Sequence, residues 1–376
     1  MSNGARSLLP VCETYEQFGD DGLILRDAGP ISVPTLDDVI GFEPLWVCME
    51  LCKRGVTWKD SVASFLLNAV ERIARMSEEL YNGTYRHGKT TTFTVMYPKR
   101  RVIVAQTFRD RIYHRSIVEN LLVRYMFPSL IYDNAACQKG KGTDFARNRL
   151  RRFLREHYAK YGTAGYILLM DVEKYYDSML HSAVEWMFAS MLPDWGAAMV
   201  VDALRAHYPG ERGYNPGSSI VQVAGVSLLN GIDHHIKERC GIRGYTRYMD
   251  DFRVISNDLA TLERCRDDVG MMLADLGMSL HPRKTRIVPI TEAVSYLGFD
   301  FRLMSTGKVT MTLDSQNVRN MRRRITGLAR LETKGLRPAG TTDQSFECWL
   351  AHASKGDSKQ LVRNNERWYR GLRNAD

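Results

Sequence analysis

Apolar positions recur along the chain at helical spacing, interrupted by short apolar runs that predict strands. After Lys59 they return at i, i+3, i+4 and i+7, which is typical of a helix with one buried face. The residues of this face are Val62, Phe65, Leu66, Ala69, Val70, Ile73 and Met76. The same criterion predicts further helices near Glu43 and over 110–125, 143–161, from 181, and over 220–240, 259–276 and 316–331. Strands are predicted over 92–96, 101–105, 166–172, 285–289 and 296–303, with a hairpin over 245–256. This mixture predicts an α+β fold with antiparallel strands.

The first 40 residues differ from the rest of the chain. Scattered Gly and Pro with weak periodicity predict a loosely structured acidic extension over residues 1–40. The whole chain nevertheless carries a net charge of +9, so the basic residues are concentrated in the body that follows. A basic body favours a polyanionic partner, and nucleic acid is the obvious one. A basic protein without such a partner is the alternative.

Composition narrows the class of protein. Hydrophobic residues at 44% and charged residues at 25% of 376 positions are typical of a globular protein and exclude a disordered or coiled-coil chain. No apolar run approaches the roughly 20 residues of a membrane span, and the N-terminus lacks a secretion signal. We therefore expect a cytoplasmic protein without membrane contact. The seven cysteines form no CxxC pair or Cys/His cluster, which predicts reduced thiols and no structural zinc site.

Two groups of acids stand at the ends of apolar segments. Asp171 follows the run Leu168–Met170, and Asp250 and Asp251 lie between Tyr248-Met249 and Phe252. Acids in such places are costly unless they are paired or bind a metal. Three converging carboxylates would supply the hard oxygen ligands that Mg²⁺ prefers, and two such ions support phosphoryl transfer. Taken alone, an Asp-Asp pair is usually a solvated turn.

The sequence Tyr-Met-Asp-Asp, with an aspartate at the end of an upstream strand, resembles the palm of reverse transcriptases. The resemblance runs from about Trp58 to Gly298 in the family's motif order. It implies a right-hand polymerase with fingers over 41–165, a palm of antiparallel sheet and helices over 166–300, and a helical thumb over 301–376. The subtype it suggests is that of bacterial phage-defence or diversity-generating enzymes, not full group II intron enzymes.

The resemblance also implies the catalytic residues. The family's triad falls on Asp171, Asp250 and Asp251, and the backbone carbonyl of Val172 would also face a metal. Two Mg²⁺ ions are the implied cofactors, with Mn²⁺ as a substitute. Lys284 follows a segment similar to the fourth palm motif. It could protonate the leaving pyrophosphate, and a phosphate-neutralising or solvated lysine is equally compatible with the sequence.

Sugar selection is implied by the residues after Asp171. Tyr176 stands five positions later, where the family places an aromatic ring under the incoming sugar. A 2′-hydroxyl would clash with that ring, so deoxynucleotides would be selected. RNA-dependent RNA polymerases instead use a second acid near this position, and Asp177 leaves that alternative open. A core tyrosine is the simplest other interpretation.

Further nucleotide contacts are implied in the fingers hairpin and in the second palm motif. Lys99 and Arg101 lie in a basic turn that resembles the fingers hairpin, where cations meet the triphosphate. Gly217 and Gln222 lie where the second palm motif is expected. This segment departs from the intron-type pattern and is similar to that of diversity-generating and phage-defence enzymes.

Basic residues and one turn complete the implied nucleic-acid surface. The phosphate-binding candidates are Lys139, Lys141, Arg147, Arg151, Arg155, Arg322 and Arg323. A solvated helix face is the alternative for the residues of the 143–161 helix. Tyr296, Leu297 and Gly298 resemble the primer grip.

The resulting hypothesis is an RNA-directed DNA polymerase that adds dNTPs to a 3′-hydroxyl. Its partners would be an RNA template, a primer or cDNA, and a structured non-coding RNA, in anti-phage defence or, as runner-up, diversity generation. A homo-oligomer or an accessory protein is left open. The alternatives are an RNA-dependent RNA polymerase, a template-independent nucleotidyl transferase, and a nucleic-acid-binding protein without catalysis.

Overall fold

The computed structural model describes residues 33–95, 100–215 and 217–374, and for Arg101 it describes the backbone alone. The chain divides into two compact units, Met1–Pro34 and Thr35–Asp376, and all that follows concerns the second. Most of the predicted acidic extension lies outside the described residues. Its last residues, Asp37–Ile40, form helix α1 with Val39 and Ile40 buried, so they belong to the folded unit.

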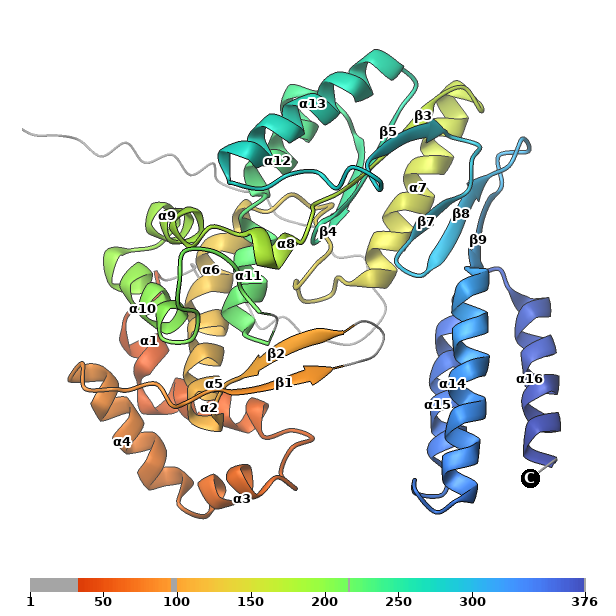
Figure 1. Cartoon of the computed structure of the whole chain (residues 1–376). Helices are drawn as coiled ribbons and strands as arrows, with labels where there is room; N and C mark the ends of the chain where they lie inside the picture. The colour runs from red at the N-terminus through yellow and green to blue at the C-terminus, as the bar shows by residue number, and fades with distance from the viewer. Residues whose placement is uncertain (1–32, 96–99, 216, 375–376) are drawn as a thin grey trace, which may run out of the picture. The chain divides into compact units, whose positions relative to one another are not determined.

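The described part of the chain before residue 130 consists of helices and one hairpin (Figure 1). The elements in order are α2 (Phe42–Cys52), α3 (Asp60–Leu67), α4 (Ala69–Tyr81), β1 (Thr91–Val95), β2 (Arg101–Ala105), α5 (Phe108–Ser116), a π-helix (Ile117–Leu122), α6 (Val123–Met126) and a 3₁₀ turn (Phe127–Ser129). The helix predicted after Lys59 is two helices, because Asn68 leaves the helical conformation at φ −127° and ψ 41°. The break rotates the buried face, and Val70 is 62% exposed.

A four-stranded antiparallel sheet lies at the centre of the described fold. Its order is β4-β5-β3-β6, with β3 (Tyr166–Asp171), β4 (Gly244–Tyr248), β5 (Asp251–Ser256) and β6 (Arg286–Pro289). Successive side chains of β3 point to opposite faces. Ile167 and Leu169 pack with helix α7 (Thr143–Tyr161), whereas Leu168 and Met170 pack with α13 (Leu259–Asp275). Burial on both faces explains the continuous apolar run in the sequence.

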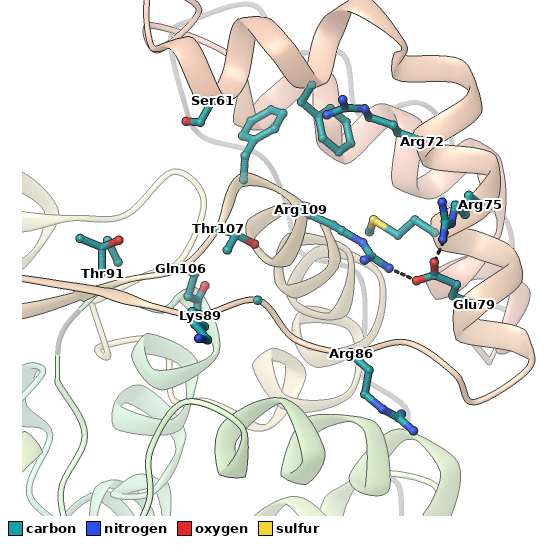
Figure 2. A pocket seen from close by; sticks show the side chains of 15 residues that line it. Ser61, Arg72, Arg75, Glu79, Arg86, Lys89, Thr91, Gln106, Thr107 and Arg109 are labelled. Atoms are coloured by element: carbon teal, nitrogen blue, oxygen red, sulfur yellow. Dashed lines mark hydrogen bonds and ion pairs between the residues drawn. The ribbon is translucent and has the colours of Figure 1, made fainter.

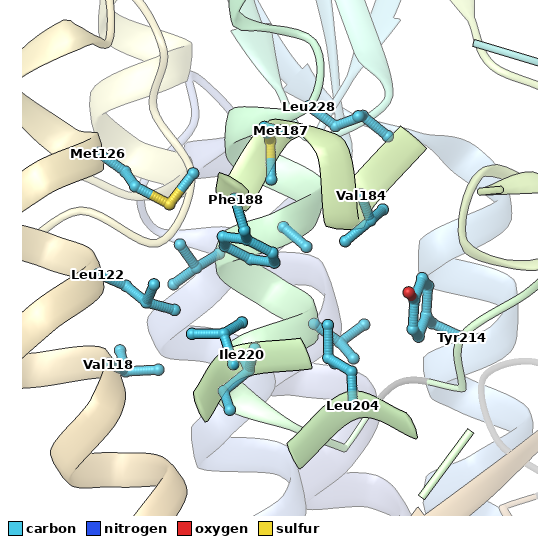
Figure 3. Close-up of a cluster of buried hydrophobic side chains, with 14 of the residues drawn as sticks. Val118, Leu122, Met126, Val184, Met187, Phe188, Leu204, Tyr214, Ile220 and Leu228 are labelled. Carbon is cyan, nitrogen blue, oxygen red and sulfur yellow. The ribbon is translucent and has the colours of Figure 1, made fainter. Parts of the chain in front are cut away.

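Short helices between β3 and β4 form a second part of the core. They are α8 (Tyr175–Ser178), α9 (His181–Met191), α10 (Asp194–Arg205), α11 (Ser219–Ser227), α12 (Asn230–His234) and a π-helix (His235–Arg239). Figure 3 shows Phe188 of α9 and Ile220 of α11 facing Leu122 and Met126. The single helix predicted over 220–240 is therefore three segments.

The C-terminal part is a small sheet followed by three helices. The sheet has the order β7-β8-β9, with β7 (Val294–Tyr296), β8 (Phe299–Leu303) and β9 (Val309–Leu313). Helices α14 (Ser315–Thr333), α15 (Thr341–Ala353) and α16 (Lys359–Asn374) follow. The strand predicted over 296–303 is two strands, because the chain turns at Leu297 and Gly298, at φ 48° and 89°.

Ion pairs between residues far apart in the sequence hold the C-terminal part against helix α7. Arg151 of α7 pairs with Asp357 at 2.9 Å, and Lys355 pairs with Asp144 at 2.5 Å. Asp357 also accepts a hydrogen bond from the backbone N–H of Met311 in β9 at 2.8 Å. The predicted division between palm and thumb at residue 300 falls inside strand β8.

The α+β class with antiparallel sheets is confirmed. None of the helices in the described ranges is both long enough and apolar enough to cross a membrane. The six cysteines of these ranges are free, and Cys12 lies outside them.

Candidate active site

The predicted carboxylates meet at one end of the four-stranded sheet. Strand β3 ends at Asp171, which pairs in register with Asp251 at the start of β5. Residues directly opposite on antiparallel strands point to the same face. Asp250 lies in the tight turn between β4 and β5, and its carbonyl accepts a hydrogen bond from the N–H of Val172 at 3.3 Å. The backbone pairing therefore places all three acids beside one another.

A buried ion pair holds the turn that carries Asp250. Met249 in this turn adopts φ 55°, a left-handed conformation that is costly for a residue other than glycine. The fully buried Arg247 donates to the Met249 carbonyl at 2.8 Å and to Asp233 at 2.7 and 2.5 Å. Tyr245 and Asn134 also donate to Asp233. The hydrogen bonds of this network offset the conformational cost of the left-handed Met249.

The electrostatics of the acids favour a bound cation. Burial raises the pKa of Asp251 to about 6; Arg253 opposes this shift, and the charges of Asp250 and Asp171 add to it. Burial and the charge of Asp171 raise the pKa of Asp250, although its own backbone N–H and the nearby cations work against the shift. Mutually repelling, partly buried carboxylates are a donor set that fits Mg²⁺. The residues present therefore fit the implied metal.

Two basic side chains already contact these acids. Lys284 donates to Asp171 Oδ1 at 2.8 Å, and Arg253 forms an ion pair with Asp251. Among the described residues, the oxygens of the three carboxylates do not all lie within 4.8 Å of one another. The acids are thus neighbours in this structure but not a closed ligand set.

Arg253 is a site residue that the sequence analysis missed. Besides pairing with Asp251, it donates to the Ser295 carbonyl at 2.6 Å, and its guanidinium lies 4.7 Å from the centre of the Tyr296 ring. It therefore links the carboxylates to strand β7. The available signal was its position two residues after Asp251, which places both on one face of the strand.

A cleft of about 580 Å³ opens beside Asp250. Tyr176 and the exposed Asp177 line it from α8, and Arg100 and Val102 line it at strand β2. The Tyr176 hydroxyl lies 3.7 Å from the Met249 sulfur. The Tyr176 ring packs on the bare backbone of Gly225, where a Cβ would stand 3.1 Å from the hydroxyl oxygen. The half-buried ring thus forms part of the cleft wall.

The structure describes some, but not all, of the other residues that are predicted to contact the nucleotide. Lys99 lies outside the described residues, and Arg101 begins strand β2. Gly217 has φ 143°, and a Cβ there would meet the Val104 carbonyl of β2 at 2.9 Å. Gln222 is exposed on helix α11. Gly217 therefore brings the segment before α11 against the β1–β2 hairpin.

Several predicted phosphate contacts are occupied within the protein. Arg147 is buried, pairs with Asp144 at 2.6 Å, donates to the Leu297 carbonyl at 2.7 and 3.1 Å, and lies over the Phe299 ring. These contacts argue against the predicted phosphate contact of Arg147, because its side chain is only 5% exposed. Arg151 is engaged with Asp357.

The remaining predicted cations differ in their surroundings. Lys141 donates to the Tyr132 carbonyl at 2.8 Å and to Gln138 at 2.9 Å, and burial lowers its pKa to about 8. Arg322 donates to Asn365 at 2.8 Å. The predicted cations that are exposed are Lys139, Arg155, Arg322 and Arg323.

Backbone strain coincides with the segments identified by resemblance. Among the described residues, four other than glycine have positive φ, namely Cys137, Lys174, Met249 and Leu297. Leu297 lies in the segment that resembles the primer grip, Met249 in the Tyr-Met-Asp-Asp segment and Lys174 between Asp171 and Tyr176, whereas Cys137 lies two residues before Lys139. Strain of this kind concentrates at functional sites because it fixes a special backbone geometry.

A second cleft, of about 710 Å³, lies between α4, α5 and the base of the β1–β2 hairpin (Figure 2). Its basic side chains are Arg72, Arg75, Arg86, Lys89 and Arg109. Arg75 and Arg109 pair with Glu79, as the dashed lines show. The other cations leave a basic surface that suits a phosphate backbone.

Telomerases are among the solved structures that are similar to this chain. An apo telomerase from Candida tropicalis truncated from its C-terminal domain has a TM-score of 0.46 and 17% identity, over 60% of this chain and 54% of that chain. A second apo telomerase from the same organism has a TM-score of 0.47 and 12% identity, over 60% of this chain and 49% of that chain. A telomerase from Candida albicans in complex with the TWJ fragment of telomeric RNA has a TM-score of 0.42 and 10% identity, over 70% of this chain and 55% of that chain. The chain thus spans about half the length of these telomerase chains.

No curated protein matches the chain. The profile of the family described as reverse transcriptase (RNA-dependent DNA polymerase) matches residues 89–301, which is more than half of the chain. The match includes the β1–β2 hairpin, the strand that ends at Asp171 and the hairpin that carries Asp250 and Asp251. The chain therefore belongs to the reverse transcriptase family of RNA-dependent DNA polymerases.

Proposed function

We propose that the chain copies an RNA template by adding dNTPs to a 3′-hydroxyl, with Asp171, Asp250 and Asp251 as the catalytic residues. The observation that carries this proposal is the register of β3 and β5. It sets Asp171 opposite Asp251, with Asp250 in the adjoining turn and the cleft of Tyr176 beside it.

The surrounding residues have distinct proposed roles. Two Mg²⁺ ions, or Mn²⁺ in their place, held by the three carboxylates and the Val172 carbonyl, would activate the attacking hydroxyl and stabilise the leaving pyrophosphate. Arg253 holds Asp251 in place through their ion pair. Lys284, whose ammonium contacts Asp171, neutralises the pyrophosphate or donates a proton to it.

Substitution of the carboxylates tests the proposal. Asp171→Asn and Asp250→Asn should abolish primer extension, because an amide binds Mg²⁺ far more weakly than a carboxylate does. RNA binding should be retained, since it depends on Lys and Arg contacts to phosphate. Asp267→Asn, at an exposed position of α13, is the matched control. Extension by the Asp250→Asn protein at the wild-type rate would refute the assignment.

A ribonucleotide polymerase is the second candidate, and one observation favours it. Asp177, the acid that could read a 2′-hydroxyl, lines the same cleft as Tyr176. Primer extension with dNTPs or NTPs, with and without an RNA template, separates the possibilities. A preference for NTPs supports an RNA polymerase, and extension without template supports a nucleotidyl transferase.

For the biological role we propose anti-phage defence with a structured non-coding RNA, and diversity generation is the runner-up. The support is the segment from Gly217 to Gln222, which resembles those enzymes more than intron-type ones. The test is to sequence the RNA that copurifies with the chain and the cDNA made from it. A single structured RNA and its cDNA support the proposal, whereas a random sample of cellular RNA contradicts it.

A further inference from the structure

Three histidines from distant parts of the chain meet in a buried cluster. His87 precedes strand β1, His114 lies in helix α5, and His207 follows helix α10. One ring nitrogen from each lies within 4.8 Å of the others. The ring centres are 5.1–5.5 Å apart, and the planes cross at 62–82°. Their side chains are at most 8% exposed. The cluster shares no residue with the candidate active site.

The outer contacts of two rings indicate which nitrogen faces the cluster. His207 Nδ1 lies 3.1 Å from the Ala203 carbonyl, which can only accept, so Nδ1 carries the hydrogen and Nε2 offers its lone pair. His87 Nε2 lies 3.3 Å from the Asp202 carboxylate, which leaves Nδ1 with the lone pair. These two inward nitrogens have no hydrogen-bond partner among the described residues. A ring held in this way from outside is oriented as metal-binding histidines are.

His114 has no polar partner at either ring nitrogen within the described ranges, although it is only 1% exposed. As a neutral imidazole the ring keeps both a lone pair and an N–H that are cut off from water. Such an unpaired group is rare in a folded protein and calls for a ligand.

A buried carboxylate lies beside two of the three histidines. Asp110, one helical turn before His114, is inaccessible to solvent and accepts hydrogen bonds from Tyr85 at 2.9 Å, Gly88 at 3.0 Å and Thr107 at 2.7 Å. Its oxygens also face His87 Nδ1 at 3.4 Å and His207 Nε2 at 3.7 Å. Nitrogen lone pairs that face a carboxylate repel it unless a metal ion or a proton lies between them.

We propose that His87, His114, His207 and Asp110 bind one Zn²⁺ ion as a closed structural site. Ligand atoms of a tetrahedral zinc site lie about 3.3 Å apart, since the metal–ligand distance is close to 2 Å. The separations of Asp110 from the two histidine nitrogens are near that value. Imidazole ligands suit zinc and not Mg²⁺, which takes oxygen ligands. The ion joins the segment before β1, helix α5 and the segment after α10.

Metal analysis of the full chain tests the site. The protein is stripped with chelator, titrated with Zn²⁺ or Co²⁺ in excess Mg²⁺, and analysed for metal content. The Mg²⁺ occupies the carboxylates of the candidate active site. We expect about one tightly bound Zn²⁺ per chain, the visible absorption of tetrahedral Co²⁺, and a melting temperature that falls on stripping and recovers with Zn²⁺.

We use two variants of the cluster, so that the site is still tested if one of them fails to fold. His114→Ala removes the central ligand, and His87→Gln changes a ring at the edge of the cluster; both should lose the bound metal. His235→Ala is the matched control, because His235, Cys240 and Asp268 form the other group of potential ligands in the described chain. It should keep the metal.

Three outcomes would overturn the proposal. They are a wild-type chain that binds no Zn²⁺, retention of the ion by both cluster variants, and loss of the ion from His235→Ala alone. The first would mean that a protonated His207 paired with Asp110 accounts for the cluster.

Discussion

Asp250 and Asp251 are weaker acids than a solvated aspartate because they are buried near like charges. The pKa of Asp251 is raised to about 6, and that of Asp250 is raised in the same direction. The folded chain keeps protons that an unfolded aspartate, with a pKa of about 3.9, has already lost. This contribution to stability is present below about pH 4 and is lost as pH rises through 6. At neutral pH the ionised acids therefore cost stability, which a bound cation restores.

Mg²⁺ should accordingly raise the melting temperature at about pH 7.5 and much less at about pH 5, because protonated carboxyls do not bind it. Thermal unfolding with and without Mg²⁺ at the two pH values measures the difference. Asp250→Asn should remove most of the shift at the higher pH, and Asp267→Asn should retain it. Equal increases in melting temperature at both pH values would show that groups other than these carboxylates bind Mg²⁺.

Tyr176 gives a prediction about sugar choice. Exclusion of a 2′-hydroxyl depends on the volume of the ring, so Tyr176→Phe should keep the preference for dNTPs. Tyr176→Ala should raise NTP incorporation relative to dNTP, with lower overall activity. The measurement is the ratio of kcat/KM for one dNTP and its matching NTP on a fixed template. A wild-type preference for the NTP would instead favour a role for Asp177.

At the scale of the element, helix α7 has two kinds of arginine. Arg147 binds Asp144 and the Leu297 carbonyl inside the protein, whereas Arg155 is exposed. The helix thus supports the turn at Leu297 through one residue and presents another to solvent. A basic helix in a sequence does not reveal this division, because both residues fit the same charge pattern.

Substitutions in α7 should therefore separate stability from binding. Arg147→Ala should lower the free energy of unfolding by about 1–3 kcal/mol, because it leaves the partly buried Leu297 carbonyl without its donor and removes the side chain that packs over Phe299, whereas Asp144 keeps Lys355. Arg155→Ala should leave stability unchanged and reduce the salt dependence of RNA affinity by up to about one unit of slope. Denaturant titration and binding at several salt concentrations provide the two measurements. An unchanged slope for Arg155→Ala would assign it to a solvated face.

At the scale of the whole molecule, strongly periodic segments were predictable from the sequence. The helix predicted over 143–161 coincides with α7, and the strand that ends at Asp171 was placed correctly, because burial on one or two faces leaves a regular apolar pattern. The family was also predicted from its motifs. The break at Asn68 was not, since a single Asn without a neighbouring Gly or Pro is a weak signal, and the strand predicted over 296–303 ran through the turn that the primer-grip resemblance implied at Leu297 and Gly298.

Features that depend on tertiary contacts were beyond the sequence analysis. The absence of a Cys/His cluster in local spacing led to the prediction that there is no structural zinc site, yet His87, His114 and His207 converge from three separate elements. The contact of Arg253 with the Ser295 carbonyl likewise joins residues 42 positions apart, so only its spacing from Asp251 was visible in the sequence. The three histidines are too far apart in sequence to form a recognisable motif.

The ion pairs between α7 and residues 355–357 have a consequence for synthesis of the chain. Arg151 and Asp357 are 206 positions apart, and Asp144 and Lys355 are 211 apart. Translation at 5–20 residues per second separates the two partners by roughly 10–40 s. During that interval the nascent helix has no C-terminal acid to neutralise Arg151. Asp144 lacks Lys355 for the same interval, so the nascent helix exposes an unpaired base and an unpaired acid, and Arg151 is free to contact surrounding RNA, including that of the ribosome.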